Sequence, residues 1–152
     1  MNVSWTWKPF LDISGAEMHE ILSVRQRVFV LEQHCFYLDA DEYDRCAEHL
    51  IARASSDEVV AYARLCKPHS KYAEPSIGRV LVVQSVRGNG FGKQLIERCI
   101  ERCKAQYTAY DIRLSAQHHM QPFYREFGFC SVGSPYDDAG ILHIDMVRSS
   151  SC

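Results

Sequence analysis

A glycine-rich turn between an apolar run and an amphipathic segment constrains the fold of this chain more than any other feature. The run Ser76–Val83 is rich in β-branched residues and predicts a strand at the centre of a sheet. From Gly92 to about Tyr107 apolar residues recur at helical spacing. Between them lies Arg87–Lys93, with the sequence Arg-Gly-Asn-Gly-Phe-Gly-Lys. A strand, a tight turn and a helix in this order predict a crossover connection at the centre of the sheet.

The other elements are predicted from periodicity and turn residues. Ser14 and Glu17 have the spacing of a capping box and mark the start of a helix. We expect strands over 3–9, 48–54, 58–66, 111–116 and 140–147, and helices over 15–29 and 120–127. With no internal repeat and no long linker, residues 1–152 are expected to form a single α/β domain of the α+β type. Its sheet is expected to be mixed, mostly antiparallel and flanked by helices.

Composition excludes several classes of protein. The net charge of −2 gives no electrostatic basis for binding nucleic acid or an anionic membrane surface. The apolar runs are too short to span a bilayer, and the first residues do not form a signal peptide. Seven cysteines at irregular spacings indicate a reducing compartment rather than a disulfide framework, with Cys99 and Cys103 buried on one helix face. We therefore expect a cytoplasmic protein, without a bound metal.

The glycine-rich turn has the chemistry of an anion site. Glycines allow the backbone to approach a ligand, and the first N–H groups of the following helix have no intrahelical partner. We expect these residues to hold a pyrophosphate. The residues concerned are Arg87, Gly88, Asn89, Gly90, Phe91, Gly92 and Lys93. They match neither the dinucleotide fingerprint nor the P-loop pattern, and three glycines alone could also form an ordinary turn or helix cap.

Two motifs resemble those of a known family. Arg87-x-x-Gly90-x-Gly92 resembles the coenzyme A loop of the GNAT acyltransferases. Further along, Tyr124-x-x-x-Gly128-Phe129 resembles the family's strand-to-helix block, although Gln117 stands where many members have asparagine. The segment Arg25–Gln33, with the residues that follow it, is similar to the ElaA-like branch. The resemblance covers about residues 4–148.

The resemblance implies an acetyl-CoA-dependent enzyme. Backbone groups of Val80, Leu81 and Val82 would pair with the pantetheine arm as an added strand does, and Gln117 would contact the cofactor. An amine would attack the acetyl thioester directly in a ternary complex, and one N–H near Val82 would polarise its carbonyl. Tyr124 would be the general acid that protonates the thiolate of coenzyme A, unless it is only a packed aromatic residue.

The base and the acceptor site remain open in the sequence. An alkylamine is protonated at neutral pH, so a base is needed, and the candidates are Glu32, His119 and His143. Each also has a structural interpretation, Glu32 as an ion-pair partner of Arg64 or Arg79 among them. The candidates for contacting the acceptor are Arg25, Glu32, His49, Arg64 and Arg79, the arginines through a carboxylate or phosphate. Asp39, Asp41 and Asp44 are expected either to attract a cationic amine or to form a solvated loop.

The predicted function is acetyl transfer to a primary amine of a small molecule or peptide. An alternative is an acyl-CoA-binding sensor or partner module without catalysis. A third possibility is acyl transfer in signal synthesis, because Arg25-x-x-Val28-Phe29 also resembles acyl-homoserine-lactone synthases. Since dimers are common among GNAT proteins, a homodimer is possible.

Overall fold

A computed structural model describes all 152 residues, and its strands form one seven-stranded sheet. The order across the sheet is β1-β2-β3-β4-β5-β7-β6. The strands are β1 (Val3–Pro9), β2 (Glu48–Ala54), β3 (Val59–Cys66), β4 (Ser76–Val82), β5 (Ile112–Gln117), β6 (Phe129–Asp138) and β7 (Ile141–Arg148). Only the β4–β5 pair is parallel. The predicted mixed, mostly antiparallel sheet flanked by helices is confirmed.

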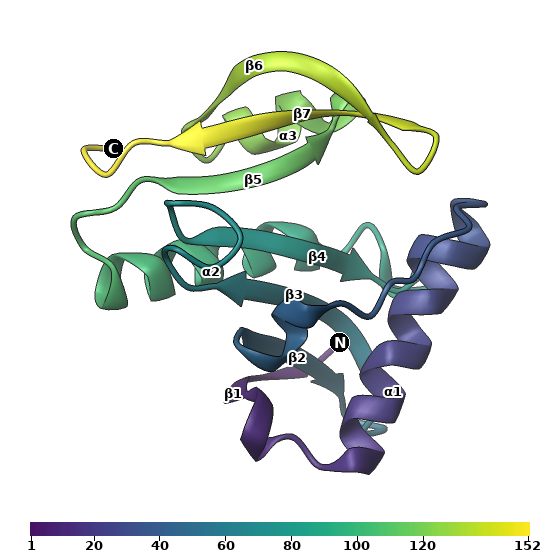
Figure 1. Cartoon of the computed structure of the whole chain (residues 1–152). Helices are drawn as coiled ribbons and strands as arrows, with labels where there is room; N and C mark the ends of the chain where they lie inside the picture. Colours follow the sequence, from purple (N-terminus) through teal and green to yellow (C-terminus); the bar gives the residue numbers. More distant parts are fainter.

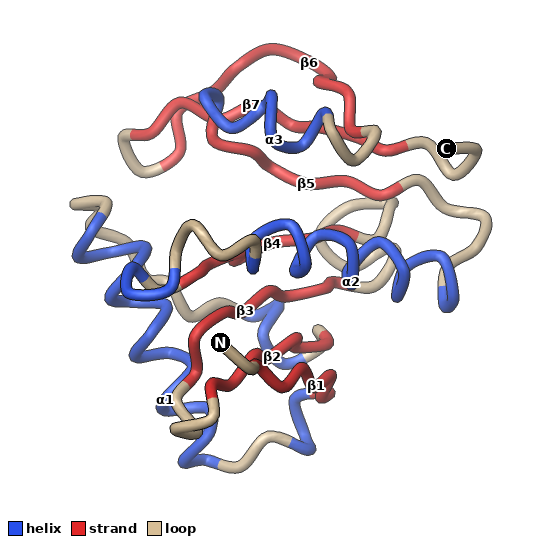
Figure 2. The backbone as a smooth tube through the Cα atoms, turned by 180° about the vertical axis from the view of Figure 1, so that it is seen from behind, coloured by secondary structure: helices blue, strands red, loops and turns tan.

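Helices cover both faces of this sheet. The helical elements are η1 (Phe10–Asp12), α1 (Gly15–Arg25), η2 (Gln26–Glu32), η3 (Glu42–Arg45), η4 (Gln84–Val86), α2 (Phe91–Gln106), η5 (His118–Met120) and α3 (Gln121–Arg125). Figures 1 and 2 show α1 on one face and α2 with α3 on the other. As its spacing predicts, Ser14 caps α1, its Oγ accepting from the N–H of Glu17 at 3.1 Å. None of the helices combines the length and apolar composition that crossing a bilayer requires.

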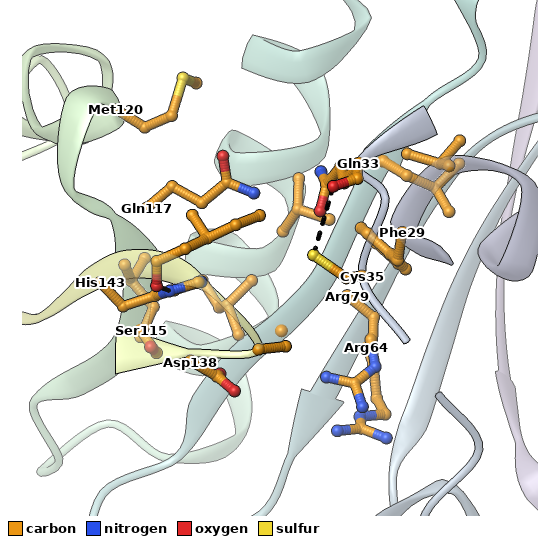
Figure 3. A pocket seen from close by; sticks show the side chains of 18 of the residues that line it. Phe29, Gln33, Cys35, Arg64, Arg79, Ser115, Gln117, Met120, Asp138 and His143 are labelled. Carbon is orange, nitrogen blue, oxygen red and sulfur yellow. Dashed lines mark hydrogen bonds between the residues drawn. The ribbon is translucent and has the colours of Figure 1, made fainter. Parts of the chain in front are cut away.

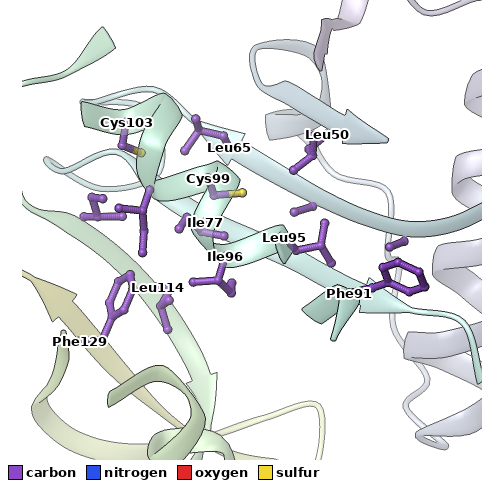
Figure 4. Packing of buried hydrophobic residues seen from close by; sticks show 14 of the residues in the cluster. Leu50, Leu65, Ile77, Phe91, Leu95, Ile96, Cys99, Cys103, Leu114 and Phe129 are labelled. Carbon is purple, nitrogen blue, oxygen red and sulfur yellow. The ribbon is translucent and has the colours of Figure 1, made fainter. Parts of the chain in front are cut away.

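Two apolar clusters hold the helices to the sheet. The larger lies under α2, where Leu95, Ile96 and Cys99 are fully buried against β3, β4 and β5 (Figure 4). The smaller joins Ile21 and Val24 of α1 to the opposite face of the sheet. Each fully buried aliphatic side chain contributes about 1.5–3 kcal/mol through removal of apolar surface from water. The expectation that Cys99 and Cys103 are buried on one helix face is confirmed.

The sheet opens between its two central strands. β4 and β5 pair only at Ser76–Arg113 and Ile77–Leu114, after which the register ends. On its other side β4 pairs with β3 across a register shift, where Arg79 has φ +51°. A non-glycine residue in this region marks a local irregularity such as a bulge. Consequently the later part of β4 has no strand partner on the side that faces β5. The strand-loop-helix crossover predicted from the glycine-rich turn joins these same two strands through α2.

Three expectations need correction. The helix predicted over 15–29 is α-helical only to Arg25 and continues as the π-helical turn η2. The strand β6 was not expected, because its sequence does not alternate and most of its residues are exposed. The acidic segment is not a solvated loop, since Asp39 and Asp44 are only 3% and 6% exposed.

Candidate active site

A cleft of about 850 Å³ lies where β4 and β5 separate. One wall comes from β4 and η2, and the other from β5, α3 and the β6–β7 hairpin. In Figure 3, Phe29, Cys35 and Arg79 lie on the first wall, and Gln117, His143 and Asp138 lie on the second. Predicted site residues from segments far apart in the sequence therefore meet in one cavity. Those lining it are Glu32, Arg64, Arg79, Val80, Leu81, Val82, Arg87, Gly92, Gln117, His119, Tyr124 and His143.

The glycine-rich turn closes one end of this cleft. Gly88 and Gly90 have φ of +83° and +80°, values that glycine adopts without the strain of a Cβ. Gly90 is the N-cap of α2 and offers no side chain to cap the helix. The first intrahelical N–H belongs to Gln94, which donates to the Gly90 carbonyl at 3.2 Å. The preceding N–H groups, including those of Phe91 and Gly92, are left without backbone partners, which suits an anion at the positive end of the helix dipole.

Two basic side chains flank this turn. Arg87 donates from Nε to the Val82 carbonyl at 2.9 Å and from Nη2 to Glu32 at 2.7 Å. Lys93 forms an exposed ion pair with Glu126 at 3.1 Å. Glu32 thus pairs with Arg87, and the expectation that its partner is Arg64 or Arg79 is wrong. Because Arg87 is nearly half exposed, its guanidinium can exchange this carboxylate for another anion at small cost.

Tyr124 presents a free hydroxyl to the cleft. The ring is half-buried against Phe123 and Phe129, with edge-to-face centroid distances of 5.1 and 6.1 Å. Its hydroxyl makes no hydrogen bond within the chain, although the side chain lines the cavity. Burial raises the pKa of Tyr124 to about 12, so the hydroxyl keeps its proton at neutral pH. The arrangement leaves a protonated donor available to a ligand.

His143 has the better defined geometry of the two candidate histidines. Its Nδ1 lies 2.7 Å from the Ile141 carbonyl, which can only accept, so Nδ1 carries the hydrogen. In the neutral ring Nε2 is then the unprotonated nitrogen and an acceptor. Tyr136 stacks on the imidazole with centroids 6.1 Å apart and planes at 22°. His119 also lines the cleft, but its side chain is exposed and makes no hydrogen bond within the chain.

A network of buried charges lies beneath the cleft. Arg25 is fully buried and donates to Asp39 and Asp44, each at 2.7 Å. Arg64 donates to Asp41 at 2.6 Å and to Asp44 at 2.9 Å. Each guanidinium bridges two carboxylates, which is the arrangement that makes buried charge tolerable. The three aspartates therefore hold arginines in place and are not free to attract an amine.

Two predicted acceptor contacts lie outside the cavity. Arg25 does not line the cleft, and its guanidinium is taken up by Asp39 and Asp44. His49 is also fully buried, with its ring nitrogens 2.6 Å from the Tyr62 hydroxyl and 2.9 Å from the Asp44 carbonyl. Neither side chain has a face that a substrate could reach. Of the three arginines predicted to contact the acceptor, Arg64 and Arg79 line the cleft.

The sequence did not reveal several residues of the cleft. Lys71 and Tyr72 come from the loop between β3 and β4, and Tyr136 and Asp138 come from β6. The Tyr136 hydroxyl hydrogen-bonds with Ser115 and, at 2.6 Å, donates to Asp145. No local pattern distinguishes these residues, because their role depends on contacts between distant segments. The structure shows no group of three or more His, Cys, Asp or Glu side chains placed to hold a metal ion.

Comparisons with known proteins show which family the chain resembles. The model of the acetyltransferase (GNAT) domain family matches residues 25–150. A UPF0039 protein from Synechocystis is 50% identical over 147 residues, with 97% of this chain and 96% of that protein covered. The crystal structure of ElaA from Escherichia coli is similar with a TM-score of 0.90 and 35% identity, over 97% of this chain and 100% of that one.

A second solved structure is similar over the same extent. It is an acyl-CoA N-acyltransferase from Pseudomonas aeruginosa, with a TM-score of 0.93, 35% identity, and 97% and 100% of the two chains covered. The ElaA-like resemblance of the sequence is thereby confirmed. On the family match, the full-length relatives and the shared structure, this chain belongs to the GNAT acetyltransferase family.

Proposed function

We propose that this protein transfers an acetyl group from acetyl-CoA to a primary amine of a small molecule or peptide, by direct attack in a ternary complex. The observation that carries the proposal is the coincidence of three features in one cleft. These are the unpaired edge of β4, the free N–H groups of the glycine-rich turn, and the unpartnered Tyr124 hydroxyl. The seven free thiols support a reducing compartment, the cytoplasm, as the place of the reaction.

The residues present fit acetyl-CoA. Val80, Leu81 and Val82 belong to the part of β4 that has no strand partner on the side of β5, where an extended amide-bearing arm can pair as an added strand does. The turn from Gly88 to Lys93 offers helix-terminal N–H groups to the pyrophosphate, with Arg87 beside it. When bound, acetyl-CoA supplies the thioester that the amine attacks.

Tyr124 is the proposed general acid. Its hydroxyl donates a proton to the sulfur as the carbon–sulfur bond breaks, so that coenzyme A leaves as a thiol. The second proton, which the nitrogen loses as the amide forms, returns to the tyrosinate and restores the acid. A thiol has an ordinary pKa near 8.5, so the leaving group is already good and the acid adds about one to two orders of magnitude. The raised pKa of Tyr124, about 12 through burial, keeps the donor protonated throughout the physiological range.

His143 is the proposed base, in preference to Glu32 and His119. Its fixed tautomer directs Nε2, a nitrogen able to accept a proton, away from the Ile141 carbonyl that holds Nδ1. Glu32 is instead engaged by Arg87, and His119 has no partner to orient its ring. The Nε2 atom takes the proton from the ammonium, directly or through a water, and so frees the lone pair that forms the new carbon–nitrogen bond.

The test is turnover of acetyl-CoA with a panel of amines, including amino acids, polyamines, amino sugars and short peptides. Products are identified by mass spectrometry, because Cys46, Cys130 and Cys152 are exposed and would react with thiol reagents. An acetylated amine supports the proposal and identifies the class of acceptor. Tight acetyl-CoA binding without any acetylated product across the panel would contradict it and favour a binding module without catalysis.

A further inference from the structure

The buried ion network of Arg25, Arg64 and the three aspartates is bordered by an exposed cation, Lys71, that has no carboxylate partner. Arg25, Arg64 and Arg79 are paired with three carboxylates, those of Asp39, Asp41 and Asp44. The exposed side chain of Lys71 lines the same cleft and takes no part in the ion pairs of these aspartates. The Nε atom of Arg64 is also buried without a hydrogen-bond partner. The cluster therefore carries a positive charge and a donor that the chain itself does not satisfy.

The setting of Lys71 favours an anion from outside the chain. Its ammonium lies over two aromatic rings, 5.8 Å from the centroid of Tyr43 and 5.6 Å from that of Tyr72. Aromatic faces attract a cation but leave its N–H donors free for a hydrogen-bond acceptor. The pKa of Lys71 is lowered, first by desolvation and then by the charges of Arg64 and Arg79. A bound anion would offset the repulsion from the two arginines.

The opposite wall of the cleft carries a carboxylate and a histidine instead of cations. Figure 3 shows Asp138 and His143 across the cavity from the guanidinium groups of Arg64 and Arg79. The Tyr136 hydroxyl on this wall donates to Asp145, whose charge is balanced by Arg113 at 2.7 Å, so Asp138 is the carboxylate that gives this wall a negative charge. One wall therefore suits a cationic amine near the proposed base, and the other suits an anion.

From this arrangement we propose that the acceptor is an amino acid, whose carboxylate binds at Lys71 and Arg79 while its amine faces His143. The proposal rests on the acetyl-transfer function proposed above and narrows its substrate. Lys71 is a specificity-determining residue in this scheme, because it contacts the part of the acceptor that does not react. A neutral amide in place of the carboxylate would leave the ammonium of Lys71 unpaired.

The experiment compares each of the common amino acids with its carboxamide as acceptor, in the intact protein with saturating acetyl-CoA. For the preferred amino acid we expect kcat/KM to be about 10- to 100-fold higher than for its amide. Lys71→Met should remove most of this ratio by lowering kcat/KM for the amino acid much more than for its amide, whereas Lys71→Arg should retain the ratio. Lys67→Met is the matched control, since Lys67 lies in the same loop but does not line the cleft.

A binding arm separates failure of this proposal from failure of the proposed function. N-acetyl amino acids and their amides are titrated calorimetrically into the protein saturated with coenzyme A. Preference for the carboxylate that disappears in Lys71→Met supports the anion site even where no amine is acetylated. Equal turnover or binding of acids and amides, or equal loss of both in Lys71→Met, would overturn the assignment.

Discussion

Replacing Asp44 with asparagine should destabilise this fold more than most single polar substitutions. The carboxylate accepts from Arg25 at 2.7 and 3.3 Å, from Arg64 at 2.9 Å and from the N–H of Asp41 at 3.1 Å. An asparagine side chain that keeps its oxygen at the Oδ1 position would direct its amide NH2 at the Arg25 guanidinium and at the N–H of Asp41, both of which are donors. Both arginines are fully buried, so water cannot replace the lost charge.

The magnitude follows from removing one carboxylate from a buried network, which leaves Arg25 paired with Asp39 alone and Arg64 paired with Asp41 alone. Breaking a buried ion pair by removing one partner costs about 3–5 kcal/mol. In a domain of this size each kcal/mol moves the melting temperature by about 2–4 °C, so we expect a fall of about 6 to 20 °C. Asp57→Asn is the control, because the Asp57 side chain is 91% exposed and its 3.9 Å contact with Arg53 contributes little.

The pH dependence gives an independent check. Burial alone would raise the pKa of Asp44, but the hydrogen bonds and charges of Arg25 and Arg64 lower it to about 2, from an ordinary value of 3.8. A depressed folded-state pKa gives stability that is complete above pH 3.8 and is lost as the pH falls towards 2. In urea unfolding, the difference in unfolding free energy between wild type and Asp44→Asn should therefore stay constant from about pH 7 to about pH 5 and narrow as the pH falls from there towards about 2. A difference in unfolding free energy below about 1 kcal/mol at neutral pH, or a difference that does not depend on pH, would refute the reasoning.

Three further substitutions test the proposed active site. Tyr124→Phe should lower kcat about 10- to 100-fold without changing acetyl-CoA affinity, and unchanged turnover would remove Tyr124 as the acid. His143→Gln keeps a hydrogen-bond donor but cannot accept a proton at neutral pH, so kcat should fall by about 10²–10⁴, with binding of coenzyme A intact by calorimetry. Gly90→Asp combines a φ of +80° with negative charge at the helix terminus, and acetyl-CoA binding should weaken at least about 100-fold. Gly15→Asp, at the first turn of α1, is its control and should bind normally, while equal affinity of both variants would mean that the turn does not hold the pyrophosphate.

The elements with regular periodicity were predictable from sequence. β2 matches the range expected from its pattern, and α2 begins one residue before the expected helix. The edge strand β6 was missed because pairing to β7 defines it, while Gly133 and Pro135 interrupt any alternation in its sequence. Edge strands need one buried face at most, so their hydrophobic signal is weak.

Some residues of the candidate site could likewise be predicted from the sequence, and others could not. The glycine-rich turn and Tyr124 belong to local motifs, so the order of residues along the chain is enough to indicate them. The arginine partners of Asp39 and Asp44 lie 14 to 40 residues away, and only the folded chain shows that these carboxylates pair with arginines. Lys71 was missed for a related reason, since what sets it apart is the lack of a nearby carboxylate.

The opening between β4 and β5 has a consequence for the mechanics of the molecule. Only two residue pairs tie the strands before the opening to those after it, so the backbone ladder is weakest at the middle of the sheet. A ligand lying along β4 would form hydrogen bonds with the unpaired edge of this strand. It would thereby connect the part of the sheet that ends at β4 with the part that begins at β5. Amide hydrogens of residues 79–82 should then exchange much more slowly when acetyl-CoA is bound, and slower exchange should extend to β5 through the shared core under α2. The sheet would reach its full stability against local opening only while acetyl-CoA is bound.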